Sequence, residues 1–354
     1  MRSRLCATLG DVPLGKFYYA VGETMKYLVT GGAGFIGSHL VDTLIAAGHQ
    51  VTVIDSLVSG KKSNLAGSWE HIEFHQVDVA TDDISEYFIG CDAVFHLAAL
   101  ADIVPSIVNP VGYMTTNVLG TLRVLESVRK HKVRRVVYAA SSSCYGLAEE
   151  VPTKETSRIQ PTYPYALSKW MGEELVMHWG ELYKFEVLSL RLFNVYGPRA
   201  RTSGNYGAVL GVFFAQHLAE LPLTVVGDGT QTRDFIYVQD VVAAFVAASR
   251  CSAKGVSINI GASNPVSVNE VARMVGGQIV NIPRRPGEPD TTHADISLAK
   301  RYLDWIPKTT FEEGMKLTIN QIQLWKDAPI WSAETIAVAT ADWFKFLGSD
   351  EETD

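Results

Sequence analysis

A glycine-rich turn between a short apolar run and a helical stretch constrains the fold of this chain most. Tyr27–Thr30 has the composition of a strand, residues 31–37 read Gly-Gly-Ala-Gly-Phe-Ile-Gly, and Ser38–Ala47 has a helical pattern. In such a turn the first glycine permits a tight bend, the second lets a phosphate approach the backbone, and the third lets the helix pack closely on the strand. We therefore predict a strand, a tight turn and a helix whose N-terminus faces an anionic ligand.

An acidic residue ends the next predicted strand. Val51–Asp55 is apolar up to its last residue, and Asp55 lies 18 residues past Gly37. A carboxylate at this place accepts hydrogen bonds from both ribose hydroxyls and repels a 2′-phosphate. The glycine turn and Asp55 together predict a dinucleotide site that takes NAD rather than NADP. The alternative for Asp55 is a residue that caps a turn.

Short β-branched runs continue to alternate with helical patterns over the first half of the chain. Apolar runs separated by helices predict a parallel sheet covered on both faces, and right-handed crossovers then give a doubly wound, Rossmann-type α/β fold. After Arg191, loops rich in Gly, Pro, Asn and Arg alternate with helical patterns near 208–220, 238–249 and 267–275, which predicts a smaller α/β substrate-binding domain. The runs of the first half are Ile72–Phe74, Ala93–Leu97, Val136–Tyr138 and Val187–Leu190.

These patterns divide the chain into four parts. Residues 25–190 form the predicted dinucleotide-binding domain, and residues 191–320 form the second domain, partly interleaved with the first. Residues 321–354 carry three tryptophans among helix formers and are predicted to pack as a helical tail. Residues 1–24 hold no apolar segment of signal-peptide length, and we interpret them as an unstructured or misassigned leader.

Composition and charge exclude several classes of protein. The 31 basic and 38 acidic residues give a net charge of −7, which provides no basic footprint for nucleic acid or for a membrane surface. The longest weakly charged stretch, residues 208–227, contains Gln216, Glu220 and Pro222 and is too polar for a membrane span. The four cysteines lack Cys-x-x-Cys spacing, so we expect no metal site and no disulfide framework, and we predict a cytoplasmic protein.

Two segments carry candidate catalytic groups. Tyr165 and Lys169 are four residues apart, hence on one face of a helix that Pro164 opens. A neighbouring ammonium and the positive nicotinamide ring of the cofactor both favour the phenolate, so we expect the pKa of Tyr165 to move from about 10 toward neutrality, as suits a base that takes an alcohol proton. Ser141, at the end of the strand Val136–Ala140, begins a serine cluster whose hydroxyl would hydrogen-bond the reacting oxygen. A polar turn with a helix cap is the alternative for this cluster.

Taken in order, these motifs resemble those of the extended short-chain dehydrogenase/reductase superfamily. They are Thr-Gly-x-x-Gly-x-x-Gly at 30–37, His-x-Ala-Ala at 96–99, Ser-Ser-Ser-x-Tyr-Gly at 141–146, Tyr-x-x-x-Lys at 165–169, and Arg-Leu-Phe-Asn-Val-Tyr-Gly-Pro at 191–198. Within the superfamily the chain is similar to the NAD-dependent epimerase/dehydratase family, in its UDP-hexose 4-epimerase group, over roughly residues 25–320. The resemblance implies a triad of Ser141, Tyr165 and Lys169. It also implies a homodimer formed through helices at about 114–131 and 165–183.

Topology and resemblance together imply the cofactor contacts, because ligands of doubly wound sheets lie at the carboxyl ends of the strands. Small side chains at Ala98 and Ala99 would let a dinucleotide lie against the backbone, and Asn117 would support the site from the following helix. We interpret His96 as a structural histidine rather than a catalyst. The expected contacts of NAD are Gly31, Gly34, Phe35, Ile36, Gly37, Asp55, Asp78, Val79, Leu97, Ala98, Ala99, Asn117, Tyr165, Lys169 and Phe193.

For the second domain the resemblance implies a nucleotide-sugar site. Arg233 and Arg285 correspond to arginines that bind the diphosphate, and two guanidinium groups can clamp a diphosphate through forked hydrogen bonds. For a single Arg the alternative is a solvated surface charge. Thr292 lies where related epimerases carry either a bulky Tyr that excludes an N-acetyl group or a small residue that admits it. The expected substrate contacts are Ser142, Ser143, Asn194, Ala208, Val209, Arg233, Arg285 and Thr292, with the backbone of 206–209.

The resemblance implies C4 epimerisation of a UDP-hexose through a 4-keto intermediate, with NAD as cofactor. The sugars are UDP-glucose and UDP-galactose and, because Thr292 is small, UDP-GlcNAc and UDP-GalNAc. Relatives that dehydrate or decarboxylate the sugar carry an acidic residue after the triad serine, where this chain has Ser142 and Ser143. Two alternatives remain. One is another nucleotide-sugar enzyme (a UDP-uronate epimerase, 4,6-dehydratase, decarboxylase or ketosugar reductase), and the other is a non-catalytic NAD sensor.

Overall fold

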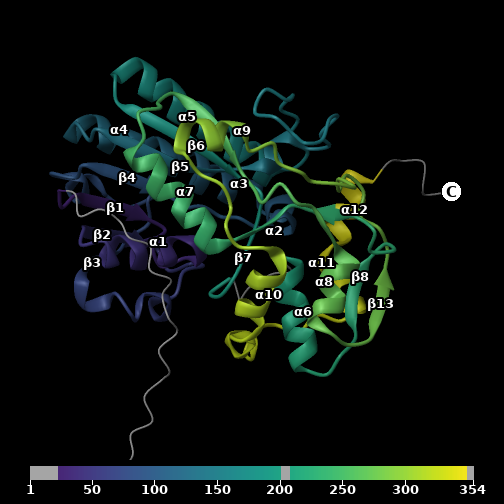
Figure 1. Cartoon of the computed structure of the whole chain (residues 1–354). Coiled ribbons are helices and arrows are strands. Elements are labelled where there is room, and N and C mark those ends of the chain that lie inside the picture. Colours follow the sequence, from purple (N-terminus) through teal and green to yellow (C-terminus); the bar gives the residue numbers. More distant parts are fainter. Residues whose placement is uncertain (1–22, 201–207, 349–354) are drawn as a thin grey trace, which may run out of the picture.

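The computed structural model describes residues 23–200 and 208–348, and its centre is a sheet of seven parallel strands (Figure 1). The strand order is β11-β6-β5-β4-β1-β2-β3, so the chain winds outward from β1 first in one direction and then in the other. The predicted Rossmann-type doubly wound fold is confirmed. Residues 1–22 of the predicted leader and residues 206 and 207 lie outside the described part of the chain. The strands are β1 (Lys26–Thr30), β2 (Gln50–Asp55), β3 (Ile72–Gln76), β4 (Ala93–His96), β5 (Arg135–Ser141), β6 (Glu186–Leu192) and β11 (Val256–Ile260).

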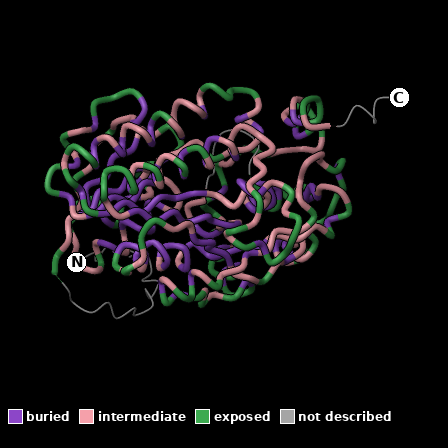
Figure 2. The backbone as a smooth tube through the Cα atoms, turned by 90° about the horizontal axis from the view of Figure 1, so that it is seen from above, coloured by how far each residue is buried: buried purple, intermediate pink, exposed green. Residues whose placement is uncertain are grey.

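Helices cover both faces of this sheet. Because successive side chains of a strand point to opposite faces, each strand packs against both layers of helices. Val29 of β1 packs in the layer of α1 and α7, whereas its neighbour Leu28 packs in the layer of α4 and α5. Figure 2 shows the buried strands as a central band between more exposed helices. Because β2 and β4 flank β1 on opposite sides, the carboxyl ends of β1 and β4 border the crevice in which such folds bind ligands. The helices are α1 (Phe35–Ala46), α4 (Gly120–His131), α5 (Pro164–Tyr183), α7 (Val238–Arg250) and α9 (Ser297–Leu303).

A π-helical turn interrupts the helix that leads into α4. The helical segment α3 (Pro110–Tyr113) runs into this turn at Met114–Leu119, and α4 continues from it. The turn places Asn117 inside the protein, where it is 1% exposed. Such turns are frequent at functional sites, because the extra residue redirects a side chain. The short helix α2 (Ile103–Val108) precedes this region.

The second lobe has its own apolar core and three two-stranded sheets. Its core includes Phe213, Phe214, Val225, Phe311 and Trp325. The helices predicted near 208–220 and 267–275 are present in this lobe. Its elements are α6 (Val209–Leu218), α8 (Val268–Val275), α10 (Phe311–Ile319) and the strand pairs β7 (Asn194–Tyr196) with β10 (Phe235–Tyr237), β8 (Leu223–Val226) with β13 (Ile279–Ile282), and β9 (Thr232–Arg233) with β12 (Val266–Ser267).

The predicted boundary at residue 190 falls inside β6, and two later elements complete the first lobe. The helix α7 packs on its sheet, and β11 pairs with β6 at the sheet edge. The sequence analysis did not predict β11 because Ser257 and Asn259 interrupt its apolar pattern. Both side chains are hydrogen-bonded inside the protein, Ser257 to Glu173 and Asn259 to Tyr145.

Within residues 321–348 the chain forms the helices α11 (Ala333–Ala339) and α12 (Ala341–Leu347), and these helices contact both lobes. Ile336 and Trp343 share an apolar cluster with Val104 of α2, Val212 of α6 and Ile282 of β13. Figure 1 places α12 beside α11 on the side of the molecule that carries β8 and β13. Among the helices of the described residues, none has the length and apolar character required to cross a bilayer.

Candidate active site

The glycine turn after β1 has a backbone that only glycine fits. Gly31 has a φ of 71°, and a Cβ there would lie 2.7 Å from the backbone nitrogen of Ala98. A Cβ on Gly37 would collide with the carbonyl oxygen of Gly31. The helix α1 begins at Phe35, so the unpaired N–H groups of its first turn lie beside this bend. The turn therefore fits the pyrophosphate of a dinucleotide.

Asp55 ends β2 with its carboxylate held beside the glycine turn. Its two oxygens accept hydrogen bonds from the backbone nitrogens of Ala33 at 2.9 Å and Leu57 at 2.8 Å. Burial raises the pKa of Asp55, and these two hydrogen bonds oppose that rise. A Cβ on Gly60 would lie 2.7 Å from the carboxylate, so the loop after β2 passes close to it. The fixed carboxylate retains lone pairs for ribose hydroxyls, as an NAD site requires.

His96 at the end of β4 has structural hydrogen bonds on both ring nitrogens. Its Nδ1 lies 2.7 Å from Thr30 Oγ1 and its Nε2 lies 2.9 Å from Thr121 Oγ1. Burial lowers the pKa of His96 to about 3, which keeps the ring neutral. Thr30 Oγ1 also accepts from the nitrogen of Ala98 at 3.1 Å, so β1 and the segment after β4 are tied together. The geometry agrees with the interpretation of His96 as structural.

Asn117 joins two segments of the crevice. Its Oδ1 accepts from the nitrogen of Leu100 at 2.8 Å, and its Nδ2 donates to Leu100 O and to Ser168 Oγ, both at 2.9 Å. The side chain therefore clamps the loop after β4 to α5. Asn117, predicted to support the cofactor site, is thus hydrogen-bonded to the protein's own groups.

The structure brings the predicted triad together at the end of β5 and the start of α5. Ser141 Oγ lies 2.7 Å from Ser143 Oγ, and Tyr165 forms a side-chain hydrogen bond with Ser141. The rings of Tyr163 and Tyr165 are parallel, with centroids 6.5 Å apart, and the ring of Tyr113 meets Tyr165 edge-on at 6.4 Å. The phenol is thus held by aromatic rings on two sides, with a hydroxyl at its oxygen.

The electrostatics of Tyr165 differ from the sequence prediction. Burial raises its pKa, whereas the hydrogen bond from Ser141 lowers it. Lys169 is 4% exposed, its Nζ lies 4.4 Å from the centroid of the Tyr138 ring, and burial lowers its pKa to about 7. A lysine in this environment is only partly charged near neutrality, so the predicted lowering of the Tyr165 pKa by Lys169 is wrong for the protein alone.

Arg233 and Arg285, predicted to bind a diphosphate, point at the same carboxylate. Arg285 Nη1 lies 2.9 Å from Glu288 Oε1, and Arg233 Nη2 lies 3.6 Å from Glu288 Oε2. Both arginine side chains are largely buried, and burial lowers the pKa of Arg233 while Glu288 opposes this. Two guanidinium groups directed at one carboxylate form a site suited to an anion. The sequence predicted the arginines but not Glu288.

The remaining predicted contacts differ in their surroundings. Thr292 Oγ1 donates to Asn194 Oδ1 at 3.2 Å and accepts from the nitrogen of Asp234 at 3.0 Å. Phe193 is buried in a cluster with Tyr145, so its side chain belongs to the core. Among the others, Val79 is buried and Asp78 accepts a hydrogen bond from the nitrogen of Ala80. Ser142 and Ser143 lie in the 3-10 turn Ser142–Tyr145, Ala208 directly precedes α6, and Val209 is its first residue. Gly34, Phe35 and Ile36 lie where the glycine turn leads into α1, and Leu97 and Ala99 lie in the segment after β4.

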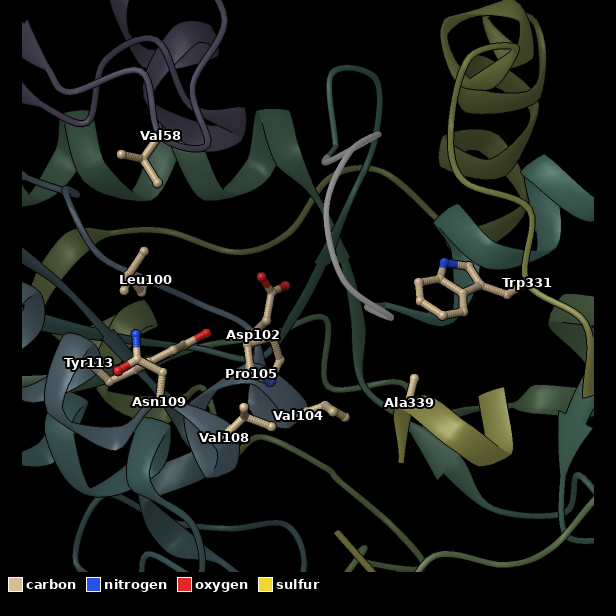
Figure 3. A pocket seen from close by; sticks show the side chains of 10 residues that line it. All are labelled: Val58, Leu100, Asp102, Val104, Pro105, Val108, Asn109, Tyr113, Trp331 and Ala339. Atoms are coloured by element: carbon tan, nitrogen blue, oxygen red, sulfur yellow. The ribbon is translucent and has the colours of Figure 1, made fainter. Parts of the chain in front are cut away.

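A cavity of about 370 Å³ adjoins this site, and the sequence analysis named none of its lining residues as contacts (Figure 3). Tyr113 connects it to Tyr165, and Val58 lies three residues past Asp55. Figure 3 shows Trp331 and Ala339 of the tail across the cavity from Leu100 and Tyr113. Among the described residues no three His, Cys, Asp or Glu side chains are placed to hold a metal ion. The lining residues are Val58, Leu100, Asp102, Val104, Pro105, Val108, Asn109, Tyr113, Trp331 and Ala339.

A doubly wound sheet with a glycine turn after its first strand, a carboxylate at the end of its second strand and a neighbouring Ser-Tyr-Lys set is typical of a dinucleotide-dependent class of proteins. The chain belongs to the NAD dependent epimerase/dehydratase family, whose sequence model matches residues 27–261. The predicted family and the predicted cofactor, NAD, are thereby confirmed.

Curated relatives include two proteins named as 4-epimerases. A putative UDP-glucose 4-epimerase of Methanocaldococcus jannaschii is 37% identical over 302 residues, which cover 83% of this chain and 97% of the relative. The UDP-glucose 4-epimerase of Mycolicibacterium smegmatis is 36% identical, with 83% and 97% covered. UDP-glucuronic acid decarboxylase 1 of Arabidopsis thaliana is 35% identical, with 89% of this chain and 72% of the relative covered.

Solved structures of similar proteins have the same fold over most of the chain. A UDP-glucose 4-epimerase of Thermotoga maritima with UDP-glucose has a TM-score of 0.80 and 34% identity, covering 84% of this chain and 99% of that one. A UDP-N-acetylglucosamine 4-epimerase of Methanobrevibacter ruminantium, in complex with UDP-N-acetylmuramic acid, has a TM-score of 0.81 and 31% identity, with 86% and 98% covered. A UDP-glucuronic acid 4-epimerase of Bacillus cereus, with UDP-glucuronic acid and NAD, has a TM-score of 0.78 and 30% identity, with 84% and 99% covered.

Proposed function

We propose that the protein epimerises a UDP-hexose at C4 through a 4-keto intermediate. The observation that carries this proposal is the position of Tyr163 between a hydrogen-bonded phenol and an anion site. Its ring is parallel to that of Tyr165, and burial raises the pKa of its hydroxyl, with a further rise from Glu288 and an opposing effect of Arg233. A UDP-sugar whose diphosphate is bound by Arg233 and Arg285 would extend its sugar toward Tyr165.

In the proposed mechanism each residue has a separate task. The turn at Gly31 and the carboxylate of Asp55 would hold NAD, which would supply reversible hydride transfer at C4. Tyr165 takes the proton of the C4 hydroxyl, and Ser141 holds the reacting oxygen by hydrogen bonding in both its alcohol and ketone forms. Lys169 would hold the cofactor ribose. Arg233 and Arg285 hold the diphosphate, so that the sugar ring can turn over and present the other face of C4 for return of the hydride, which inverts C4, while Tyr165 returns the proton to the oxygen.

Epimerisation is favoured over the other reactions of the family by the serine cluster. Decarboxylation or dehydration requires an acidic group beside the reacting carbon, and Ser142 and Ser143 follow Ser141 here. Because a relative is named as a UDP-glucuronic acid decarboxylase, decarboxylation of UDP-glucuronate is the second candidate reaction.

The proposed substrates include sugars with a 2-acetamido group, because Thr292 is small. Its hydroxyl is hydrogen-bonded to Asn194, a predicted substrate residue, and this contact supports a role of position 292 in the sugar site. UDP-GlcNAc should therefore be converted as well as UDP-glucose, and Thr292→Tyr should remove the activity toward UDP-GlcNAc alone. Equal loss with both sugars would contradict this assignment.

We also propose that two copies associate through the surface of the π-helical turn and α5. Leu119, Met171, Leu182 and Tyr183 on these elements are 37% to 54% exposed. Large apolar side chains gathered on neighbouring helices are typical of an interface between subunits. Light scattering should give the mass of a dimer, and Met171→Asp with Leu182→Asp should give that of a monomer.

The test of the proposed reaction is a product analysis. Purified protein is incubated separately with UDP-glucose, UDP-GlcNAc and UDP-glucuronate, and the sugars are identified by NMR. Epimers at C4 of equal mass, formed without added NADH, are the expected result. Release of CO₂ from UDP-glucuronate, or accumulation of a dehydrated sugar, would assign one of the alternative reactions instead.

A further inference from the structure

Trp343 of the tail is in contact with the loop that carries Arg285. The indole is 2% exposed, and its Nε1 donates a hydrogen bond to the carbonyl oxygen of Pro286 at 2.7 Å. Because Pro286 directly follows Arg285, this bond fixes the backbone beside one of the two arginines of the anion site.

The same indole also contacts the guanidinium group. The central carbon of the Arg285 guanidinium lies 5.7 Å from the ring centroid of Trp343, within range of a cation–π interaction. Glu288 accepts a hydrogen bond from the same guanidinium at 2.9 Å. An aromatic ring and a carboxylate therefore orient Arg285 together.

Trp343 contacts the catalytic side of the site through Tyr163. The two ring centroids are 6.1 Å apart, and Tyr163 is in turn parallel to Tyr165. Tyr163 immediately precedes Pro164, the first residue of α5. The indole thus lies between the arginine loop and the N-terminus of the helix that carries the proposed base.

The helix α12 is itself held by both lobes. Trp343 belongs to the apolar cluster that includes Val104 of α2 in the first lobe and Ile282 of β13 in the second. The indole is therefore anchored on α2 and α6 as well as on β13, which leads into the loop that it contacts.

We propose that Trp343 is a positioning residue of the nucleotide-sugar site, which sets the distance between the diphosphate-binding arginines and Tyr165. This inference rests on the proposed function only in taking a nucleotide diphosphate as the ligand. A sugar held by its diphosphate reaches the base in few orientations if this distance is fixed, and in many if the loop is loose. Trp343 touches no reacting atom in this arrangement, and its effect passes through Arg285.

The experiment compares the binding of UDP and of uridine to the NAD-loaded protein by calorimetry and ligand-observed NMR. Trp343→Ala should raise the Kd of UDP about tenfold, the effect of weakening one charged hydrogen-bonding group, and change the Kd of uridine less than about twofold. Trp343→Phe keeps a ring over Arg285 but lacks the indole N–H, so its Kd for UDP should lie between those of wild type and Trp343→Ala. Phe346→Ala, on the same helix at a side chain 60% exposed, should change neither Kd.

Equal weakening of UDP and uridine binding by Trp343→Ala, or no weakening of either, would overturn the proposal. A merely structural role predicts the first of these results, because it affects both ligands. If the wild type epimerises UDP-sugars while the ratio of the two Kd values is unchanged in Trp343→Ala, only the positioning role fails. If Trp343→Ala raises the Kd of UDP relative to that of uridine while the wild type epimerises no sugar, only the proposed reaction fails. A wild type that binds no UDP overturns both.

Discussion

Glu173 of α5 and Arg191 of β6 form a buried ion pair behind the proposed catalytic residues, with Arg191 Nε 3.0 Å from Glu173 Oε1. The side chains are 2% and 7% exposed. Glu173 also accepts hydrogen bonds from Ser189 and Ser257, and Arg191 Nη1 donates to the hydroxyl of Tyr145 at 2.8 Å. The pair therefore joins α5, two strands and the turn after β5 in one network.

Replacing Glu173 by Gln should destabilise the protein by about 3–5 kcal/mol, because the guanidinium of Arg191 would remain buried without its counter-charge. The free energy of unfolding in urea measures this effect. Glu174→Gln is the matched control, since its side chain is exposed on the same helix, and should change stability by less than about 0.5 kcal/mol. Equal effects of the two substitutions would show that the ion pair does not stabilise the fold.

Replacing Tyr165 by Phe should lower kcat for C4 epimerisation about 10³-fold, the usual contribution of a positioned general base. The phenyl ring keeps its parallel contact with Tyr163, so binding of NAD and of UDP should be unchanged. Steady-state kinetics and the NAD content of the purified variant are the measurements. Tyr183→Phe, at the exposed end of the same helix, should have wild-type kcat. A Tyr165→Phe variant with near-normal turnover would remove Tyr165 from its proposed role.

Replacing Ser141 by Ala should move the acidic limb of the kcat/KM profile to higher pH. The hydrogen bond from Ser141 lowers the pKa of Tyr165 against the effect of burial, and its loss leaves burial unopposed. Profiles between pH 5 and 10 for the wild type and the variant measure the shift. An acidic limb at the same pH in both would show that this hydrogen bond does not set the ionisation of the base.

The sequence predicted the parts of the site that depend on local backbone geometry. The turn at Gly31 requires a positive φ, and the strand that ends in Asp55 places a carboxylate beside it, so motif and spacing determine the structure there. The pairing of Arg233 with Arg285 was predictable only by resemblance. The two residues are 52 positions apart in the sequence, and a tertiary fold brings them to Glu288.

Other features depend on contacts between distant segments and left no signal in the sequence pattern. The low pKa of Lys169 comes from its burial against Tyr138 of β5, which a Tyr-x-x-x-Lys spacing does not reveal. The role that we propose for Trp343 follows from contacts with residues 57 and more positions earlier in the chain. The three tryptophans of the tail indicate that it packs on the rest of the protein, but they do not indicate which elements it contacts.

Protonation of His39 should account for part of the loss of stability in acid. Its Nε2 lies 2.9 Å from the carbonyl oxygen of Pro198, and its Nδ1 lies 3.0 Å from the amide nitrogen of Gln239. These partners suit a neutral imidazole, which donates at Nε2 and accepts at Nδ1. Burial and the charge of Arg199 lower its pKa to about 4. The unfolded chain binds a proton near pH 6.5 and the folded one only near pH 4, so stability falls as the pH drops through this window.

The size of this effect follows from the two pKa values. A difference of about 2.5 pH units corresponds to about 3 kcal/mol of stability, present above pH 6.5 and lost by pH 4. In urea titrations at pH 7 and pH 4, His39→Gln should lose about 3 kcal/mol less than the wild type, because a neutral amide keeps a donor toward Pro198 and does not titrate. His71→Gln, at an exposed histidine, is the control. If His39→Gln loses as much stability as the wild type over this interval, another group is responsible for the acid sensitivity.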